Sequence, residues 1–155
     1  MQKILPLLML GVLWGCTHAQ VQPTLAQVKP AVVQPMSKER QELEALLRKT
    51  VIHFNFNEDL LSQDSQGHLQ KVATVMKKHK ALNIKIAGNC DERGTEEYNL
   101  ALGQRRADVA KKYIVSLGVS DRQVDTVSYG KEKPADPGHD EDAWAQNRRD
   151  EFQPQ

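Results

Sequence analysis

Residues 84–107 read IKIAGNCDERGTEEYNLALGQRRA and contain three local patterns in succession. The apolar residues of the first pattern predict a buried strand over 83–89. A polar loop follows, and Thr95 is a favourable N-cap for a helix whose first turn carries two glutamates. The helical pattern continues to about Leu117 and ends at Gly118. This stretch therefore predicts one strand–loop–helix unit.

Similar patterns flank this unit on both sides. Alternation of apolar and polar residues predicts a strand over 51–57, with Ile52, Phe54 and Phe56 on its buried side. The other predicted elements are helices over 37–49, 64–80 and about 143–149, and a strand over 123–129. This order predicts an α/β fold, a two-layer sandwich of the form βαβαβ with a closing element.

Arg106 lies on the apolar face of the predicted helix over 96–117. On a helical wheel it falls within a stripe that also contains Leu102 and Val109, whereas Arg105 falls outside the stripe. An isolated buried charge is very unfavourable, so Arg106 must either pair with a structural carboxylate or face a cleft. In a cleft its guanidinium would hold a ligand carboxylate through two parallel hydrogen bonds. Asp91, just upstream of the helix, would supply the complementary charge.

The N-terminus has the pattern of an export signal. A lysine precedes twelve residues, 4–15, without a charged or polar side chain, and such a run is shorter than the ~20 residues that span a bilayer. The run ends Leu13-Trp14-Gly15-Cys16, which resembles a bacterial lipobox. The pattern predicts a signal peptide over 1–15 and lipidation of Cys16. The alternative is a secreted protein without an anchor, in which Cys16 has no role.

Three spaced prolines and the lack of a helical or strand period predict a flexible tether over 17–36. Together with the lipidation of Cys16, this divides the chain into a signal peptide, a lipidated tether over 16–36, a short helix over 37–49 and one domain over 50–155.

Composition narrows the classes of function. The 155 residues have room for one domain of ordinary size, and a net charge of +1 argues against a general nucleic-acid binder. Two cysteines argue against a disulfide-stapled miniprotein or a zinc-ribbon array. The chain contains neither a Gly-x-Ser-x-Gly elbow nor a His-Glu-x-x-His pair, so we expect no enzyme, no metal site and no cofactor.

Several motifs in order resemble the OmpA-like peptidoglycan-binding domain, and within that family its lipid-anchored branch, the peptidoglycan-associated lipoproteins. The resemblance covers about residues 50–150. The motifs are NCDERGT over 89–95, YN over 98–99, LGQRRA over 102–107, SLGV over 116–119, VSYGKEKP over 127–134, GHD over 138–140 and NRR over 147–149. The resemblance implies a mixed sheet with helices on one face.

The resemblance also implies a binding function without catalysis. In that family the domain binds the peptide stem of peptidoglycan through diaminopimelate, whose side-chain end carries an ammonium and a carboxylate. By position, Asp91 would bind the ammonium and Arg106 the carboxylate. The positions that would line or support the same site are Asn57, Asn99, Asn147 and Arg148.

The implied setting is the cell envelope. Members of the lipid-anchored branch face the periplasm from the outer membrane, bind a TolB-like periplasmic propeller protein and act in the Tol-Pal system during cell division. Two other classes stay open, namely an envelope lipoprotein that binds proteins but not the wall, and a peptidoglycan-acting enzyme.

Two positions depart from the family pattern. The first strand of the family usually carries aspartates where this chain has Asn55 and Asn57, so Asn57 brings no charge to the site. The family usually closes with an apolar strand, whereas residues 150–155 are polar here. The departure predicts a last strand that is short or frayed.

Overall fold

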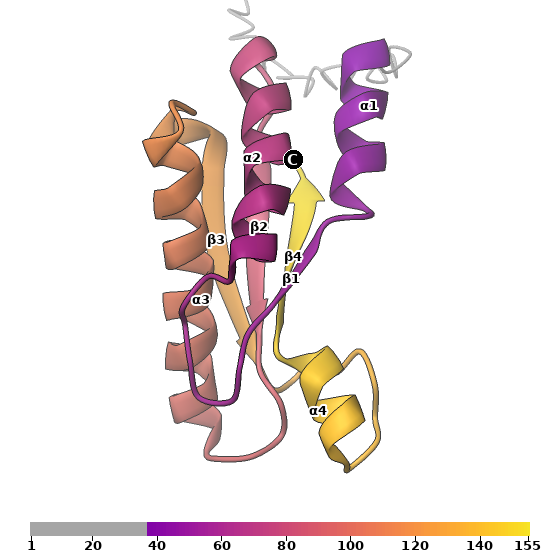
Figure 1. Ribbon diagram of the computed structural model, residues 1–155, viewed down its shortest axis with the longest axis vertical. Helices are drawn as coiled ribbons and strands as arrows, with labels where there is room; N and C mark the ends of the chain where they lie inside the picture. Colours follow the sequence, from indigo (N-terminus) through magenta and orange to yellow (C-terminus); the bar gives the residue numbers. More distant parts are fainter. Residues whose placement is uncertain (1–36) are drawn as a thin grey trace, which may run out of the picture. The chain divides into compact units, whose positions relative to one another are not determined.

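The computed structural model describes residues 37–155, and Figure 1 shows how their helices and strands are arranged. The helices are α1 Lys38–Leu47, α2 Gln63–Lys78, α3 Glu96–Ser116 and α4 Glu141–Asn147, with a 3-10 turn at Asp121–Gln123. The strands are β1 Val51–His53, β2 Ile84–Asn89, β3 Val124–Gly130 and β4 Arg149–Pro154. The predicted signal peptide, the lipidation of Cys16 and the tether lie outside the described residues.

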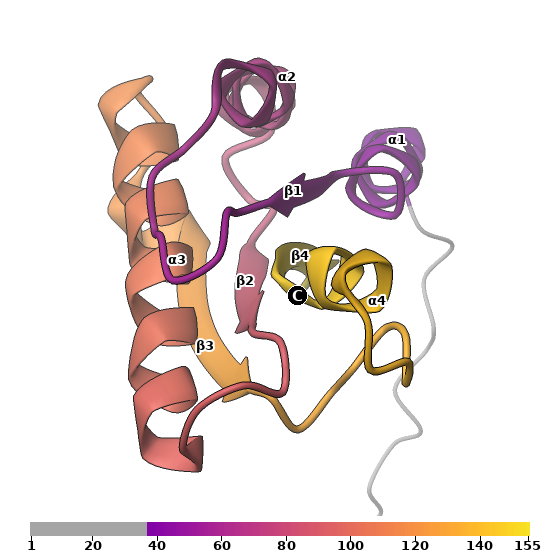
Figure 2. The same ribbon diagram turned by 60° about the horizontal axis from the view of Figure 1, so that its bottom comes forward.

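The strands form a mixed sheet in the order β1-β4-β2-β3. β2 and β3 are parallel, while β4 runs antiparallel to both β1 and β2. Helices α1, α2 and α3 cover one face of this sheet (Figures 1 and 2). The predicted α/β sandwich, a mixed sheet with helices on one face, is confirmed.

Polar N-caps fix the starts of the helices close to their predicted positions. Ser37, Ser62, Thr95 and Asp140 each accept a hydrogen bond from the main-chain N–H three residues further on. α1, although predicted as a separate short helix, buries Leu43 and Leu47 in the same core as the sheet.

The predicted strand over 51–57 is wrong in its second half. β1 ends at His53, and although Ile52 and Phe54 are buried, Phe56 is 56% exposed. The chain leaves the sheet after His53 and turns at Asn57, which adopts a left-handed conformation with φ 57°. Phe56 consequently lies at the rim of a pocket and not in the core.

The prediction of a short or frayed last strand is also wrong. β4 lies in the interior of the sheet and pairs with β1 on one side and β2 on the other. Its residues alternate, so Asp150 and Phe152 are buried while Glu151 and Gln153 are only half-buried. A polar sequence is compatible with an interior strand here because the sheet is covered by helices on one face only.

A close approach of two backbones fixes α3 on the sheet. A Cβ atom at Gly88 would lie 2.0 Å from the carbonyl oxygen of Gly103, so neither glycine leaves room for a side chain. This contact sets α3 directly against β2 and places Arg106, one turn beyond Gly103, beside the end of that strand.

Candidate ligand-binding site

A pocket lies where the loops that follow β1 and β2 meet the first turns of α3 and the end of α4, at the lower end of the molecule in Figure 1. The cavity has a volume of about 190 Å³. Three guanidinium groups and one carboxylate reach it, those of Arg93, Arg106, Arg148 and Asp91. The rest of the lining is Phe56, Asn57, Cys90, Gly94, Tyr98, Asn99 and Leu102.

Arg106 is fully buried and holds the two loops together. Its Nε donates to the carbonyl of Glu58 at 2.8 Å, its Nη2 to that of Asn55 at 3.0 Å and its Nη1 to that of Asn89 at 3.1 Å. Burial lowers the pKa of this guanidinium, although the nearby Cys90 thiol and the carboxylates oppose that shift. The charge is therefore satisfied chiefly by main-chain oxygens, while the group still borders the cavity.

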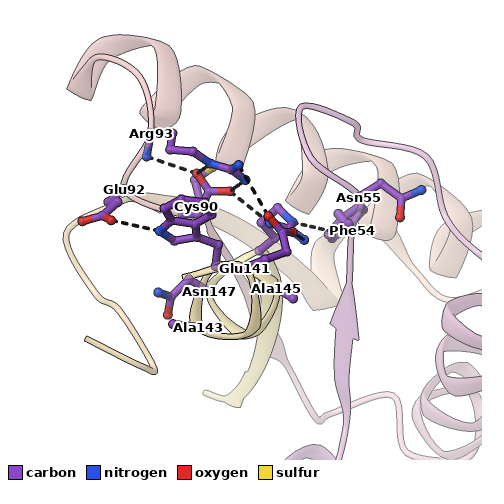
Figure 3. A network of polar contacts seen from close by, with 12 residues as sticks. Phe54, Asn55, Cys90, Glu92, Arg93, Glu141, Ala143, Ala145 and Asn147 are labelled. Carbon is purple, nitrogen blue, oxygen red and sulfur yellow. Dashed lines mark hydrogen bonds and ion pairs between the residues drawn. The ribbon is translucent and has the colours of Figure 1, made fainter. Parts of the chain in front are cut away.

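Asp91 accepts hydrogen bonds from two arginines, in the polar network of which Figure 3 labels Arg93, Glu92 and Glu141. Its Oδ1 accepts from the main-chain N–H of Arg93 at 3.1 Å and from Arg93 Nε at 3.3 Å. Its Oδ2 accepts from Arg93 Nη2 at 2.7 Å and from Arg148 Nη1 at 3.3 Å. Burial acts to raise the pKa of Asp91, but these hydrogen bonds outweigh it and hold the pKa below its usual value. Asp91 is thus an anion at neutral pH.

Arg148 is fixed on two further sides. Its Nε donates to the carbonyl of Phe54 at 3.1 Å, and its Nη2 donates to Glu141 at 2.7 Å. These contacts hold the guanidinium as a wall of the pocket, next to Asp91.

Arg93 was not predicted as a site residue, yet it donates three of the four hydrogen bonds that Asp91 accepts. Its guanidinium lies between two aromatic rings, 4.0 Å from the centroid of Phe56 and 4.1 Å from that of Trp144. The sequence places Arg93 two residues after Asp91 in a polar loop, but Phe56 and Trp144 belong to segments far away in the sequence. Only the fold brings them together.

Glu92 in turn holds Trp144 in place. The indole Nε1 donates to a carboxylate oxygen of Glu92 at 2.9 Å, and Nδ1 of His139 lies 2.8 Å from the same carboxylate. The hydrogen bonds from Trp144 and His139 lower the pKa of Glu92.

Two predicted asparagines lie at the pocket. Asn99 is buried and donates from Nδ2 to the carbonyl of Arg93 at 2.9 Å, so it braces the loop that carries Asp91. Asn57 lies at the rim, where its Oδ1 accepts from the Tyr98 hydroxyl.

The structure does not bring Asn147 into this pocket. Its Oδ1 accepts from the N–H groups of Ala135 and Asp136 at 2.7 and 3.0 Å, and its Nδ2 donates to the carbonyl of Asp136 at 2.7 Å. All of these bonds brace the loop that leads to α4. Asp91, Arg106, Arg148, Asn99 and Asn57 therefore share one cavity, and Asn147 supports it from outside.

The arrangement suits a small zwitterion better than a reaction. A carboxylate offers a place for a cation, and guanidinium groups around it offer places for an anion. Burial raises the pKa of the Cys90 thiol, so the sulfur stays protonated and is a poor nucleophile. Over residues 37–155 the structure contains no cluster of His, Cys, Asp and Glu side chains suited to a metal ion. Within the same range, no helix is long and apolar enough to cross a membrane.

Fold and pocket together define a ligand-binding α/β domain of the OmpA type, and comparison with known proteins agrees. The family model described as "OmpA family" matches residues 53–148. The chain belongs to the OmpA family.

Two of the most similar curated relatives share one name. The chain is 46% identical to a peptidoglycan-associated lipoprotein of Pasteurella multocida over 102 residues, which is 66% of this chain and 68% of the relative. It is 44% identical to a protein of the same name from Pseudomonas aeruginosa over 110 residues, 70% of this chain and 65% of the relative. The matched segment thus spans about two thirds of these relatives, none of which is named as an enzyme.

Solved structures agree with the fold. The crystal structure of the peptidoglycan-associated lipoprotein from Burkholderia pseudomallei is 47% identical, with a TM-score of 0.69, and the match covers 71% of this chain and 93% of that one. The C-terminal domain of MotB from Helicobacter pylori, at 23% identity and a TM-score of 0.64, shares the fold.

Proposed function

We propose that this protein is an envelope lipoprotein that binds peptidoglycan non-covalently through the diaminopimelate of its peptide stem. Asp91 would bind the ammonium of the diaminopimelate side chain, and the guanidinium groups around it would bind the carboxylate. The protein would thereby link the outer membrane to the cell wall. It carries out no catalysis in this role.

The observation that carries the proposal is the single carboxylate among three guanidinium groups at a cavity of about 190 Å³. Asp91 is kept ionised by its neighbours, and the surrounding side chains are held by hydrogen bonds before any ligand arrives. Such preorganisation lowers the entropy lost on binding. The names of the relatives support the choice of peptidoglycan.

The proposed setting rests on the N-terminal sequence and on the resemblance to the family. Cys16 would be lipidated and would anchor the protein in the outer membrane, facing the periplasm. The TolB-like propeller protein would be its partner in the Tol-Pal system, with a role in cell division. Labelled palmitate tests the anchor, because the Cys16→Ala variant should incorporate none.

Co-sedimentation with purified sacculi tests the binding. The wild-type protein should pellet with the sacculi without releasing muropeptides, since binding and not hydrolysis is proposed. Asp91→Asn keeps the shape of the side chain but removes its charge, so we expect binding to weaken roughly 30-fold or more. Arg105→Gln is the control, because Arg105 is half exposed and pairs with Asp59 at 3.5 Å, outside the pocket. Equal pelleting of all three proteins would refute the proposal.

A further inference from the structure

Asp91 is already paired with a cation in the free protein. Both of its oxygens accept hydrogen bonds, in total three from Arg93 and one from Arg148. A ligand ammonium that binds Asp91 must therefore replace the side chain of one of these two arginines.

Arg148 is the less exchangeable of the two. Its side chain is only 8% exposed and is tied to Phe54 and Glu141 as well as to Asp91. The side chain of Arg93 is 30% exposed, and its other ionic partner is Glu141 at 3.5 Å. Asn99 holds the main-chain carbonyl of Arg93 independently, so the side chain can change partner while the loop keeps its shape.

The aromatic rings of Phe56 and Trp144 determine what Arg93 does after it leaves Asp91. The Arg93 Cζ atom lies 4.0 and 4.1 Å from the centroids of the two rings, which hold the guanidinium by cation–π contact without accepting from its N–H groups. The sandwich therefore keeps the cation at the pocket when the hydrogen bonds to Asp91 are broken. Released from Asp91, the guanidinium keeps only the largely exposed Glu141 at 3.5 Å as an ionic partner, so a second acceptor at the pocket is favourable.

We propose that Arg93 is the exchangeable partner of Asp91 and makes the site specific for a ligand end that carries both an ammonium and a carboxylate. The ligand ammonium would take the place of Arg93 on Asp91, and the ligand carboxylate would accept from the released Arg93. One internal ion pair is replaced by two ion pairs to the ligand. A ligand with an ammonium alone would leave Arg93 with Glu141 but without a replacement for the two side-chain hydrogen bonds that it gave to Asp91. This inference rests on the proposed function.

Two stem peptides that differ by one carboxylate test the exchange. We would measure the affinity of the full-length protein in detergent for L-Ala-D-Glu-meso-diaminopimelate and for L-Ala-D-Glu-L-Lys by calorimetry. The wild type should prefer the diaminopimelate peptide by about 30-fold or more, since a missing ligand group leaves a buried polar partner unsatisfied. In Arg93→Gln the preference should fall to about threefold or less, because the carboxylate loses its partner while Asp91 becomes easier for a plain ammonium to reach.

Arg105→Gln, the matched control, should keep the wild-type preference. If Arg93→Gln keeps it as well, Arg93 does not set specificity and the inference fails while the proposed function stands. If the wild type binds neither peptide, the proposed function itself fails. Thermal melts monitor folding, and should Arg93→Gln not fold, Trp144→Leu decides instead. Trp144→Leu removes one of the two rings that contact Arg93. A reduced preference for the diaminopimelate peptide supports the exchange of Arg93, and an unchanged preference overturns it.

Discussion

The surroundings of Arg106 were predicted from the sequence only in part. Its place in an apolar stripe predicted that it must be paired or face a cleft, and it is buried at the edge of a cavity. The sequence suggested a carboxylate as the partner, whereas the structure supplies the carbonyls of Asn55, Glu58 and Asn89. Every residue carries a carbonyl, so no sequence pattern could have indicated which ones Arg106 contacts. For the same reason the sandwich around Arg93 was not foreseen.

The buried hydrogen bonds of Arg106 predict a stability defect. Arg106→Ala leaves three carbonyls without their donor, so we expect the free energy of unfolding to fall by about 3–5 kcal/mol. Urea denaturation of the variant measures this loss. Arg105→Ala, on the exposed side of the same helix, should change the value by less than about 0.5 kcal/mol. A small change in the free energy of unfolding of Arg106→Ala would mean that the two loops do not depend on this side chain. Any loss of ligand binding in that variant would then come from a lost contact to the ligand.

Asp150 predicts an unusual dependence of stability on pH. It is fully buried in β4, neither carboxyl oxygen has a hydrogen-bond partner, and burial raises its pKa well above the usual value although Arg106 opposes this. In the unfolded chain the group loses its proton near pH ~3.9, whereas the folded protein keeps it to higher pH. The contribution of Asp150 to stability is therefore greatest below that pH and is lost as the pH rises through the folded-state pKa.

Replacing the carboxyl group tests this reasoning. Asp150→Asn should be more stable than the wild type at pH 7 by at least about 1 kcal/mol, and the difference should shrink toward pH 4. Thermal and urea unfolding at both pH values provide the measurement. Asp125→Asn, at an exposed position of β3, should show no such dependence. If the stability difference between Asp150→Asn and the wild type stays constant with pH, Asp150 is not protonated in the folded protein.

At the level of elements, local patterns located α1 to α4, β2 and β3 to within a few residues, but not their neighbours in space. The caps and the apolar periodicity are local signals, so Thr95 and Gly118 marked α3 closely. β1 was overextended because alternation continues through Phe56 while the left-handed turn at Asn57 does not show in the pattern. β4 was predicted to be short or frayed because residues 150–155 are polar, whereas the place of a strand in the sheet is a property of the whole sheet.

The packing of α3 on β2 predicts opposite effects for two glycine substitutions. A Cβ at Gly103 would lie 2.4 Å from Ser128 Oγ and 2.9 Å from the carbonyl of Gly88, so Gly103→Ala should push the helix from the sheet and lower stability by about 1–3 kcal/mol. At Gly67 in α2 a Cβ would meet no atom within 4 Å, so Gly67→Ala should raise stability by about 0.5–1 kcal/mol. Thermal unfolding of both variants distinguishes steric from propensity effects, and a neutral Gly103→Ala would show that α3 can shift without loss.

On the scale of the whole described domain, the pocket and the start of α1 lie at opposite ends. Figure 1 shows α1 beginning at the end where α2 and α3 finish, whereas the pocket lies beyond the far end of β2. The N-terminal end of α1 therefore lies on the side away from the proposed wall-binding site. With Cys16 as the proposed anchor, such an arrangement would suit a protein held at two surfaces at once.

Site-directed labelling tests whether only one end of the domain contacts the wall. In a Cys16→Ala background, a bulky maleimide on Lys80→Cys, at the end of the domain remote from the pocket, should leave sacculus binding unchanged. The same label on Tyr98→Cys, which lines the pocket, should abolish it. Each labelled protein is compared with its unlabelled form, and Cys90 is buried and should not react. Loss of binding from both labels would mean that the wall contacts more than one end of the domain.

The interior position of β4 has a consequence for how the sheet folds. β4 is the last strand in the sequence, yet it separates β1 from β2, which pair with it and not with each other. The sheet cannot close until residues 149–154 are in place, because β1 and β2 meet only through that strand. Closing the sheet therefore requires pairing between segments about 60 to 100 residues apart in the sequence, which is a slow step compared with forming a helix.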